Sequence, residues 1–165
     1  VSRDWSSDVC SSDLKDVYLA YGLELKHKHL PEMRVYGRLS AAPVFQPSYA
    51  AFAQGMLVNV PLHLRTLAKK ASGKDLHAIL AERYAGQRFV KVMPLRSSTA
   101  GVAPDALNGT NMMELFVFES EANGQALLTA RLDNLGKGAS GACVQNMDLM
   151  LGLKQTDAAL PIAAE

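Results

Sequence analysis

The sequence predicts an α+β fold, in which a mixed, largely antiparallel sheet is combined with two or three helices. Two strand-like runs, residues 113–119 and 125–132, are joined through Asn123 and Gly124, and an Asn-Gly pair is the strongest short signal for a β-hairpin. Apolar residues recur at helical spacing across residues 74–84. Together, the hairpin and the amphipathic segment predict helices that lie against a sheet.

Residues 1–14 do not share the pattern of the remaining chain. Their Ser and Asp repetition lacks the periodicity of any packed element, and the stretch resembles the in-frame translation of a DNA-sequencing adaptor. We therefore expect residues 1–14 to be a disordered, non-native leader that is not part of the fold. A natural disordered leader is the alternative.

Composition excludes several classes of protein. The chain has 165 residues, of which 48% are hydrophobic, so it can build one domain with a core. Without the one Arg and three Asp of residues 1–14, the formal charge rises from +1 to only +3, which argues against a nucleic-acid surface. No apolar stretch reaches the roughly 20 residues of a membrane span. Cys143 is the only cysteine after the leader, so no disulfide framework points to secretion.

The first half of the chain contains one predicted helix and two predicted strands. Proline is favoured at the first position of a helix, so a helix is expected to begin at Pro31 and to end near Leu39. The residue before a proline is pushed towards extended geometry, which predicts an extended approach to this helix. Strands are expected at residues 42–46 and 55–64; Pro61 makes the second one an edge strand or a bulge.

The second half is expected to complete the sheet. Gly86 is the stop signal of the helix at residues 74–84. A strand is expected at residues 88–95, followed by a long polar loop at 96–111 and then by the hairpin. His63 lies on the earlier strand at 55–64, where a packed or half-exposed structural role is expected.

The segment 126–152 predicts a strand, a glycine-rich turn and a final helix. Ser140 or a neighbouring backbone group is expected to cap the helix, and Gly152 stands at the position of a C-terminal glycine. Helix N-termini offer unpaired N–H groups, so the turn is expected to bind a phosphate or a carboxylate. Its glycines form the pattern G-x-G-x-x-G of a dinucleotide-binding turn. That interpretation is not favoured, because such a turn also requires a following strand and an acidic residue about 20 positions on. A structural loop that packs the last helix is the alternative.

Two histidines and two lysines stand side by side before Pro31. His27 and His29 are expected on the same side of an extended segment and can serve acid–base chemistry, while the lysines can hold an anionic substrate. A solvated basic turn is the alternative. No third ligand follows at recognisable spacing, so we expect no metal site.

Four motifs carry a resemblance to a known family. They are His27-Lys-His-Leu-Pro-Glu-Met33, Gln54-Gly-Met56, Ala106-Leu-Asn-Gly-Thr110 and Leu132-Asp-Asn-Leu-Gly-Lys-Gly-Ala-Ser-Gly-Ala-Cys-Val-Gln-Asn-Met147. In this order they resemble the C-terminal half of N-acetyl-γ-glutamyl-phosphate reductases. The similarity runs over residues 15–153, which we expect to form the substrate and oligomerisation domain, with residues 154–165 as a tail. The implied fold is that of the C-terminal domain of the glyceraldehyde-phosphate and aspartate-semialdehyde dehydrogenase superfamily.

The resemblance implies a cytoplasmic enzyme of arginine biosynthesis that reduces N-acetyl-γ-glutamyl phosphate to N-acetylglutamate semialdehyde. In such enzymes a cysteine thiolate attacks the acyl phosphate, phosphate leaves and NADPH reduces the thioester. The cofactor NADP is bound mainly by an N-terminal Rossmann domain, which, like the nucleophilic cysteine, is expected to lie upstream of this chain. The chain alone is therefore expected to be inactive, and the intact enzyme is expected to be a homo-oligomer that binds neither nucleic acid nor a membrane.

Individual roles follow from the same resemblance. His29 and His27 are the catalytic candidates, with a preference for His29 because it adjoins the start of the helix. Cys143 stands within the last helix, where it is expected to have a packing role and not to act as the nucleophile. The remaining candidates are Lys28, Glu32 and Gln54 for the substrate, and Gly136, Lys137, Gly138, Ser140 and Gly141 for the cofactor.

Two alternatives stay open. The enzyme class can be kept with another acyl phosphate as substrate, such as aspartyl phosphate or a longer aminoadipyl analogue. The chain can also be a non-catalytic α+β assembly module that pairs through its sheet.

Overall fold

The computed structural model describes residues 18–95 and 101–155. The predicted leader at 1–14 lies outside the described residues, as does the predicted tail from residue 156 onward. The chain divides into two compact units, Val1–Ala53 and Gln54–Glu165. The single domain expected for residues 15–153 thus contains parts of both units and stays a prediction.

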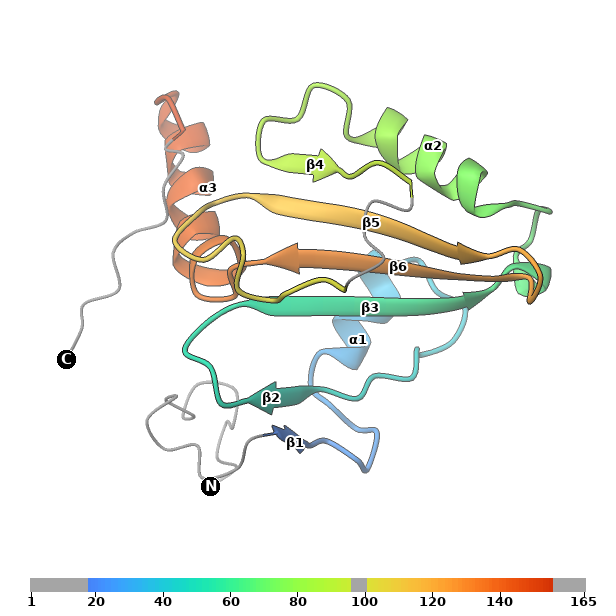
Figure 1. The fold of residues 1–165 in the computed structure, drawn as a ribbon. Coiled ribbons are helices and arrows are strands. Elements are labelled where there is room, and N and C mark those ends of the chain that lie inside the picture. Colours follow the sequence, from blue (N-terminus) through green and yellow to red (C-terminus); the bar gives the residue numbers. More distant parts are fainter. Residues whose placement is uncertain (1–17, 96–100, 156–165) are drawn as a thin grey trace. The chain divides into compact units, whose positions relative to one another are not determined.

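In the first unit, a small antiparallel sheet and one short helix are described (Figure 1). Strand β1 (Tyr18–Ala20) pairs with β2 (Ser48–Ala50), and α1 spans Leu30–Tyr36. The helix begins at Leu30, one residue before the predicted start at Pro31, and it ends before Leu39. It stops because Gly37 is the C-cap and Arg38 adopts a left-handed φ of 51°.

Two local predictions for this unit are wrong. Residues 42–46 form no strand; β2 begins only after Pro47, since the prolines at 43 and 47 withhold N–H donors from a ladder. His29 is also not extended, because as the N-cap of α1 it has φ −79° and ψ −10°, in the helical region.

In the second unit, a four-stranded sheet with the order β3-β6-β5-β4 is described. The strands are β3 (Met56–His63), β4 (Val90–Val92), β5 (Met113–Ser120) and β6 (Gln125–Leu132). Neighbouring strands are antiparallel except for β4 and β5, which are parallel. The predicted mixed, largely antiparallel sheet is therefore confirmed, although β4 is shorter than the strand expected at residues 88–95.

Local sequence explains two features of this sheet. The β5–β6 turn contains Gly124 with φ 57°, a conformation that glycine adopts without a steric penalty. Pro61 lies in β3, an edge strand of the sheet, where the missing N–H is tolerated.

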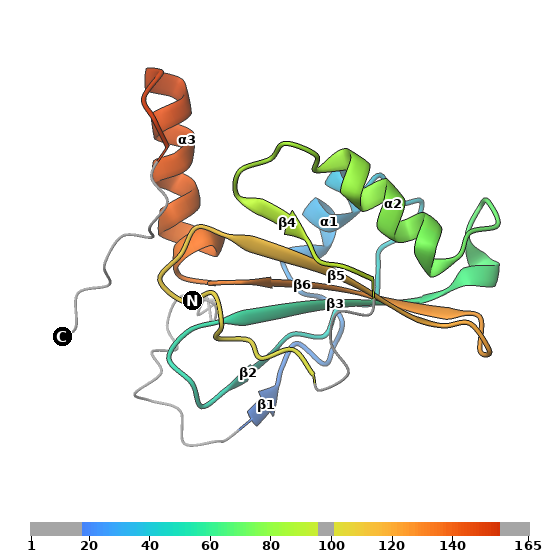
Figure 2. The same ribbon diagram turned by 45° about the horizontal axis from the view of Figure 1, so that its top comes forward.

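Helix α2 (Gly73–Arg83) lies next to β4 and β5 (Figures 1 and 2). His77 connects the helix to the chain beyond β4, because its Nε2 lies 2.9 Å from the carbonyl oxygen of Met93. The buried apolar residues of the described chain belong to this unit and come from the sheet and the approach to β4: Phe89, Phe116, Val117, Ala126 and Leu132. The core of this unit therefore lies at the sheet, whose two central strands are β5 and β6.

The last strand leads into a π-helical turn, η3 (Gly136–Ser140), and then into α3 (Gly141–Leu151). The predicted strand, turn and helix are confirmed, and Gly152 ends α3 with a left-handed φ of 66°. Beyond the end of the sheet, α3 points away from it (Figures 1 and 2).

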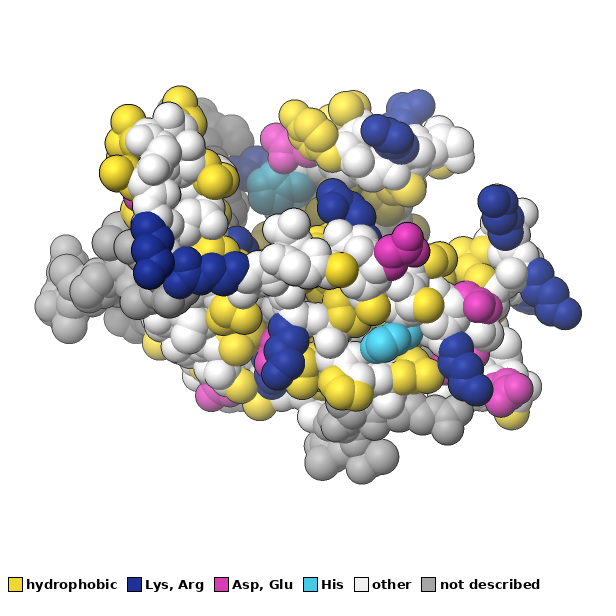
Figure 3. Space-filling model, turned by 90° about the horizontal axis from the view of Figure 1, so that it is seen from above, with side chains coloured by type: hydrophobic (Ala, Val, Ile, Leu, Met, Phe, Trp, Pro, Cys, Tyr) yellow, Lys and Arg dark blue, Asp and Glu magenta, His cyan; other side chains and the backbone are white. Residues whose placement is uncertain are grey.

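Helix α3 exposes apolar side chains and buries polar ones. Met147, Leu149, Met150 and Leu151 are at least half exposed, whereas Gln145 and Asp148 are buried. Figure 3 looks down on this helix and shows hydrophobic side chains around its free end. Cys143 is exposed on α3, so its predicted packing role is wrong: the side of the helix that carries Cys143 faces solvent instead of a core. Among the described residues, no helix is long and apolar enough to cross a membrane.

Candidate functional site

The first group of predicted site residues lies in the turn before α1. The rings of His27 and His29 are 4.8 Å apart between centroids, and the backbone N–H of His29 donates to Nδ1 of His27 at 3.3 Å. The ring of His27 also lies edge-on to Phe45 at 5.0 Å and at 6.1 Å from Tyr21. Because its Nδ1 is an acceptor, a neutral His27 carries its proton on Nε2. This packing and hydrogen bond fix the orientation of His27.

His29 is placed differently. Its side chain is half-buried against the His27 ring, and within the described chain its imidazole nitrogens make no hydrogen bond. An imidazole with both nitrogens available can accept or donate a proton near neutral pH. Lys28 and Glu32, the predicted substrate residues of this segment, are exposed beside it.

The second group of residues surrounds a carboxylate that the sequence reasoning did not single out. Asp133 is 1% exposed and follows β6 directly. Its Oδ2 accepts hydrogen bonds from Nε2 of Gln54 at 3.1 Å and from N–H of Gly109 at 2.8 Å. Its Oδ1 accepts from the N–H groups of Leu135 at 2.9 Å and Gly136 at 3.0 Å. One carboxylate therefore joins the start of β3, the loop before β5 and the glycine turn, residues 135–141. We call this meeting point of three segments the junction.

Neighbouring polar groups reinforce this junction. The N–H of Gly55 donates to Oδ1 of Asn134 at 2.7 Å, and Nδ2 of Asn108 donates to the carbonyl oxygen of Gln54 at 3.0 Å. Gly55 has φ 116°, and a Cβ there would lie 2.7 Å from the carbonyl oxygen of Pro104. The close approach of these two backbones thus requires glycine at position 55.

The glycine turn uses its N–H groups within the chain. Those of Gly138, Ser140 and Gly141 donate to carbonyl oxygens of residues 133–136. The hydroxyl of Ser140 donates to the carbonyl oxygen of Leu135 and makes no capping bond, so of the two predicted caps of α3, the Ser140 side chain and a neighbouring backbone group, the first is wrong. The anion at this helix start is the carboxylate of Asp133 itself.

Lys137 of the glycine turn contacts α3 and the residue before β4. Its Nζ donates to Oε1 of Gln145 at 2.7 Å and lies 5.6 Å above the ring of Phe89. Burial lowers the pKa of Lys137, because a charged ammonium loses hydration there. In the described chain, Nε2 of Gln145 and Oδ2 of Asp148 are buried without a hydrogen-bond partner.

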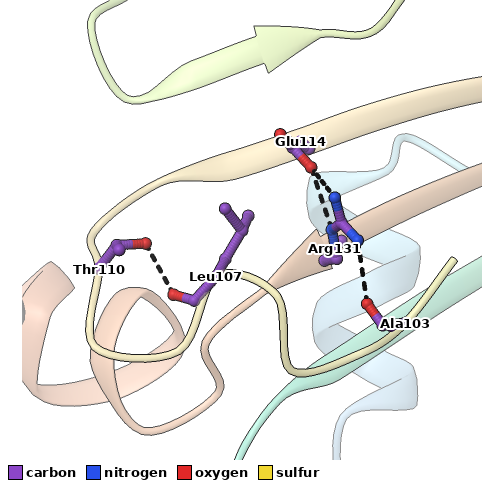
Figure 4. A network of polar contacts seen from close by, with 5 residues as sticks. All are labelled: Ala103, Leu107, Thr110, Glu114 and Arg131. Carbon is purple, nitrogen blue, oxygen red and sulfur yellow. Dashed lines mark hydrogen bonds and ion pairs between the residues drawn. The ribbon is translucent and has the colours of Figure 1, made fainter. Parts of the chain in front are cut away.

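An ion pair supports the sheet beside the junction. Arg131 on β6 binds Glu114 on β5 and donates to the carbonyl oxygen of Ala103, as Figure 4 shows. Its guanidinium also lies 5.3 Å from the ring centre of Phe116. Through its bond to Ala103, Arg131 connects β6 to the loop before β5, the loop that presents Gly109 to Asp133.

A separate hollow of about 590 Å³ lies at the hairpin end of the sheet. Its lining includes Pro61, His63, Phe118, Ser120, Gln125 and Leu127, and it contains none of the predicted site residues. His63 is exposed, not packed or half-exposed as expected. No cluster of three or more His, Cys, Asp or Glu side chains that could hold a metal occurs in the described part of the chain.

Comparison with known proteins identifies the family of the chain. The model of the family described as "Semialdehyde dehydrogenase, dimerisation domain" matches residues 3–134. The chain belongs to this family. The resemblance to the semialdehyde dehydrogenases is thereby confirmed, and so is the α+β fold it implies. The match to the dimerisation domain ends at residue 134, before η3 and α3 begin.

Three curated relatives of the chain share one name. N-acetyl-γ-glutamyl-phosphate reductase of Sinorhizobium fredii is 53% identical over 134 residues, which are 81% of this chain and 44% of the relative. The protein of the same name from Rhizobium etli is 54% identical over 136 residues, or 81% and 44% of the two chains. That from Brucella ovis is 55% identical over 134 residues, or 80% and 43%. The chain thus spans less than half the length of the relatives it matches.

Within this semialdehyde dehydrogenase domain, sequence reasoning found most elements but missed the junction residue. Asp133 lies inside the motif that carries the resemblance, directly before the glycine-rich turn. The available signal was an Asp and an Asn directly before a glycine-rich turn, since such side chains often accept hydrogen bonds from the backbone two or three residues on.

Proposed function

We propose that the chain is the substrate-binding and dimerisation part of an NADP-dependent N-acetyl-γ-glutamyl-phosphate reductase, a cytoplasmic enzyme of arginine biosynthesis. The observation that carries this proposal is the shared name of relatives that are more than half identical over about four-fifths of the chain. The matching family is named for dimerisation, which supports a homo-oligomeric enzyme.

The geometry of the histidine turn supports a division of labour. His29 transfers the proton at the reacting carbonyl, because its imidazole is half-buried and its nitrogens are available. His27 orients it through the hydrogen bond from the His29 backbone and through ring contact. We assign the attacking thiolate to another part of the reductase and not to Cys143, which is exposed on α3.

Substrate contacts are proposed for Lys28, Glu32 and Gln54. The exposed ammonium of Lys28 suits an anionic group of N-acetyl-γ-glutamyl phosphate, and Glu32 lies one helical turn from His29 to orient cationic neighbours or substrate N–H groups. Gln54 gives its Nε2 to Asp133. Its Oε1 is then directed to the opposite side of the amide and can accept the acetamido N–H of the substrate.

The glycine turn does not fit a phosphate cradle for NADP. Five of its backbone N–H groups, those of residues 135, 136, 138, 140 and 141, are already bonded inside the chain. We therefore propose that the turn contacts NADP only through groups other than the phosphates. The residues concerned are Gly136, Lys137, Gly138, Ser140 and Gly141. The phosphates of NADP belong to the nucleotide-binding part of the reductase.

A chimera tests the proposal. Residues 15–165 replace the matching region of the Sinorhizobium fredii reductase, and NADPH oxidation is followed with N-acetyl-γ-glutamyl phosphate. We expect turnover by the chimera and none by the 165-residue chain alone. Turnover by the chain alone would place the nucleophile within it, and a folded chimera that prefers aspartyl phosphate would shift the substrate class. A folded chimera with no reductase activity would favour the non-catalytic assembly module.

The chimera also tests the assignment of the proton-transfer group. His29→Ala is expected to lower kcat by about 10²-fold or more, the scale of a lost acid–base group, and to remove one limb of the pH–rate profile. His63→Ala is the matched control, since His63 is an exposed histidine on β3 outside both groups of site residues. A near-normal rate for His29→Ala together with a large loss for His27→Ala would reverse the two roles.

A further inference from the structure

The carboxylate of Asp133 binds three separate segments of the second unit. Gln54 is 79 residues upstream, Gly109 is 24 residues upstream, and Leu135 and Gly136 follow within the glycine turn. Each oxygen accepts two hydrogen bonds, so the carboxylate oxygens are occupied. At 1% exposure, water cannot replace a lost partner without an opening of the structure.

This arrangement makes the three segments interdependent. A buried carboxylate is stabilised by its N–H donors, and the loss of one donor leaves charge that is poorly solvated. Movement of the glycine turn away from Asp133 therefore weakens the hold on Gln54 and Gly109. Conversely, a shift of Gln54 changes the environment of the turn, because both bind the same side chain.

We propose that Asp133 is a positioning residue that holds the carboxamide of Gln54, the loop at Gly109 and the glycine turn in one fixed arrangement. The consequence for catalysis rests on the proposed function, in which Gln54 contacts the acyl-phosphate substrate. Asp133 fixes which face of the Gln54 amide is left for that substrate, because it takes Nε2. It is thus a determinant of substrate affinity that acts through Gln54 and does not touch the substrate.

Amide hydrogen exchange on the full 165-residue chain tests the positioning role without any assumption about activity. In Asp133→Asn, the N–H groups of Gly109, Leu135 and Gly136 are expected to exchange at least about tenfold faster, the scale of one charge-assisted hydrogen bond. Amides of the β5–β6 hairpin are expected to change little. Asp105→Asn is the control, since Asp105 is an exposed carboxylate in the same loop as Gly109.

A milder variant covers the case in which Asp133→Asn does not fold. Gln54→Met keeps the length of the side chain but removes the donor, so only one of the four bonds is lost. Faster exchange of the Gly136 amide in Gln54→Met would show that the two segments are coupled through Asp133. Unchanged exchange at Gly109 and Gly136 in the folded variants, or an equal acceleration at every amide, would overturn the proposal.

Kinetics of the chimera test the catalytic consequence. Asp133→Asn is expected to raise KM for N-acetyl-γ-glutamyl phosphate about tenfold, while the pKa values in the pH–rate profile stay in place, because His29 is untouched. Asp133→Glu is expected to recover part of the affinity. An unchanged KM in an active, folded Asp133→Asn chimera would refute the effect on substrate. If the parent chimera is inactive, the proposed function fails, whereas the exchange experiment still decides the positioning role.

Discussion

A carboxylate accepts backbone N–H groups both at the start of α2 and at the start of the η3–α3 segment. The first carboxylate is exposed and the second is buried. At α2, the exposed Asp75 accepts from the backbone N–H and the hydroxyl of Ser72, while the Ser72 oxygen accepts from the N–H of Asp75, a reciprocal capping box. At η3, the buried Asp133 accepts two N–H groups of its own turn and two donors from distant segments.

This difference separates local from tertiary stabilisation. Asp75 and Ser72 are three residues apart, and water can replace either partner, so the capping box stabilises mainly the first turn of α2. Asp133 cannot exchange its partners for water, so its bonds stabilise the meeting of three segments. The same type of hydrogen bond therefore caps a helix in one place and organises a candidate site in the other.

The largest expected effect is the loss of the buried carboxylate. Asp133→Ala leaves four donors, one buried and three part-buried, without their acceptor, so we expect the free energy of unfolding to fall by roughly 4 kcal/mol. Urea unfolding followed by circular dichroism measures this loss. Asp75→Ala is the matched variant at the other helix start and should cost far less. Equal losses at the two positions would remove the distinction between them.

A steric test at Gly141 and Gly138 comes next. A Cβ at Gly141 would lie 1.9 Å from Oδ1 of Asn111 and 2.8 Å from the carbonyl oxygen of Gly136, so Gly141→Ala should cost about 2 kcal/mol through forced displacement. A Cβ at Gly138 meets its nearest neighbour at 3.4 Å, so Gly138→Ala should be nearly neutral. The melting temperatures of both variants measure the contrast. Similar Tm values would show that the turn tolerates rearrangement around Asp133.

The exposed capping box predicts a smaller change. Ser72→Ala removes the side-chain acceptor for the Asp75 N–H, which costs about 1 kcal/mol at a helix N-cap. Exchange of the first amides of α2 should accelerate, while those of the glycine turn should not. Loss of protection at Gly109 or Gly136 in Ser72→Ala would contradict the local character of this cap.

The smallest effect concerns acid. The backbone hydrogen bond from Ser72, and then its hydroxyl, lower the pKa of Asp75 from the ordinary value of 3.8. A carboxyl whose pKa is lower in the folded state stabilises the protein above its unfolded-state value and loses this contribution as pH falls from about 3.8 through the folded value. The stability difference between the parent chain and Asp75→Asn should therefore be constant near neutrality and shrink below pH 3.8. A difference that grows on acidification would reverse the sign of this linkage.

Local patterns predicted most of the secondary structure. The Asn-Gly hairpin, the edge strand with Pro61, the helix ended near Gly86 and the final helix ended at Gly152 were all expected from short-range sequence and are present. The failures are also local in origin. Competing signals at Gly37 and Pro47 ended one helix early and displaced one strand, and the helical backbone of His29 replaced the extended geometry expected before Pro31.

The candidate site was only partly predictable. The resemblance carried by four motifs gave the family, which the family match confirms, and it pointed to His27, His29 and Gln54. It could not show that His27 is held by an aromatic contact and a backbone hydrogen bond, while the imidazole nitrogens of His29 make no hydrogen bond to any residue that the structure describes. It also could not show that five N–H groups at the glycine turn already donate within the chain, so that these five are not available to the phosphate that the turn alone suggested.

The sequence by itself determined the α+β class, the hairpin, the two long helices and membership of the semialdehyde dehydrogenases, because those depend on periodicity, turn chemistry and motif order within short stretches. Only the tertiary structure decided that Asp133 is the centre of the second group of site residues. Its partners at Gln54 and Gly109 are 79 and 24 residues away, and no pattern within a short stretch records which distant donors a folded sheet brings to one buried carboxylate.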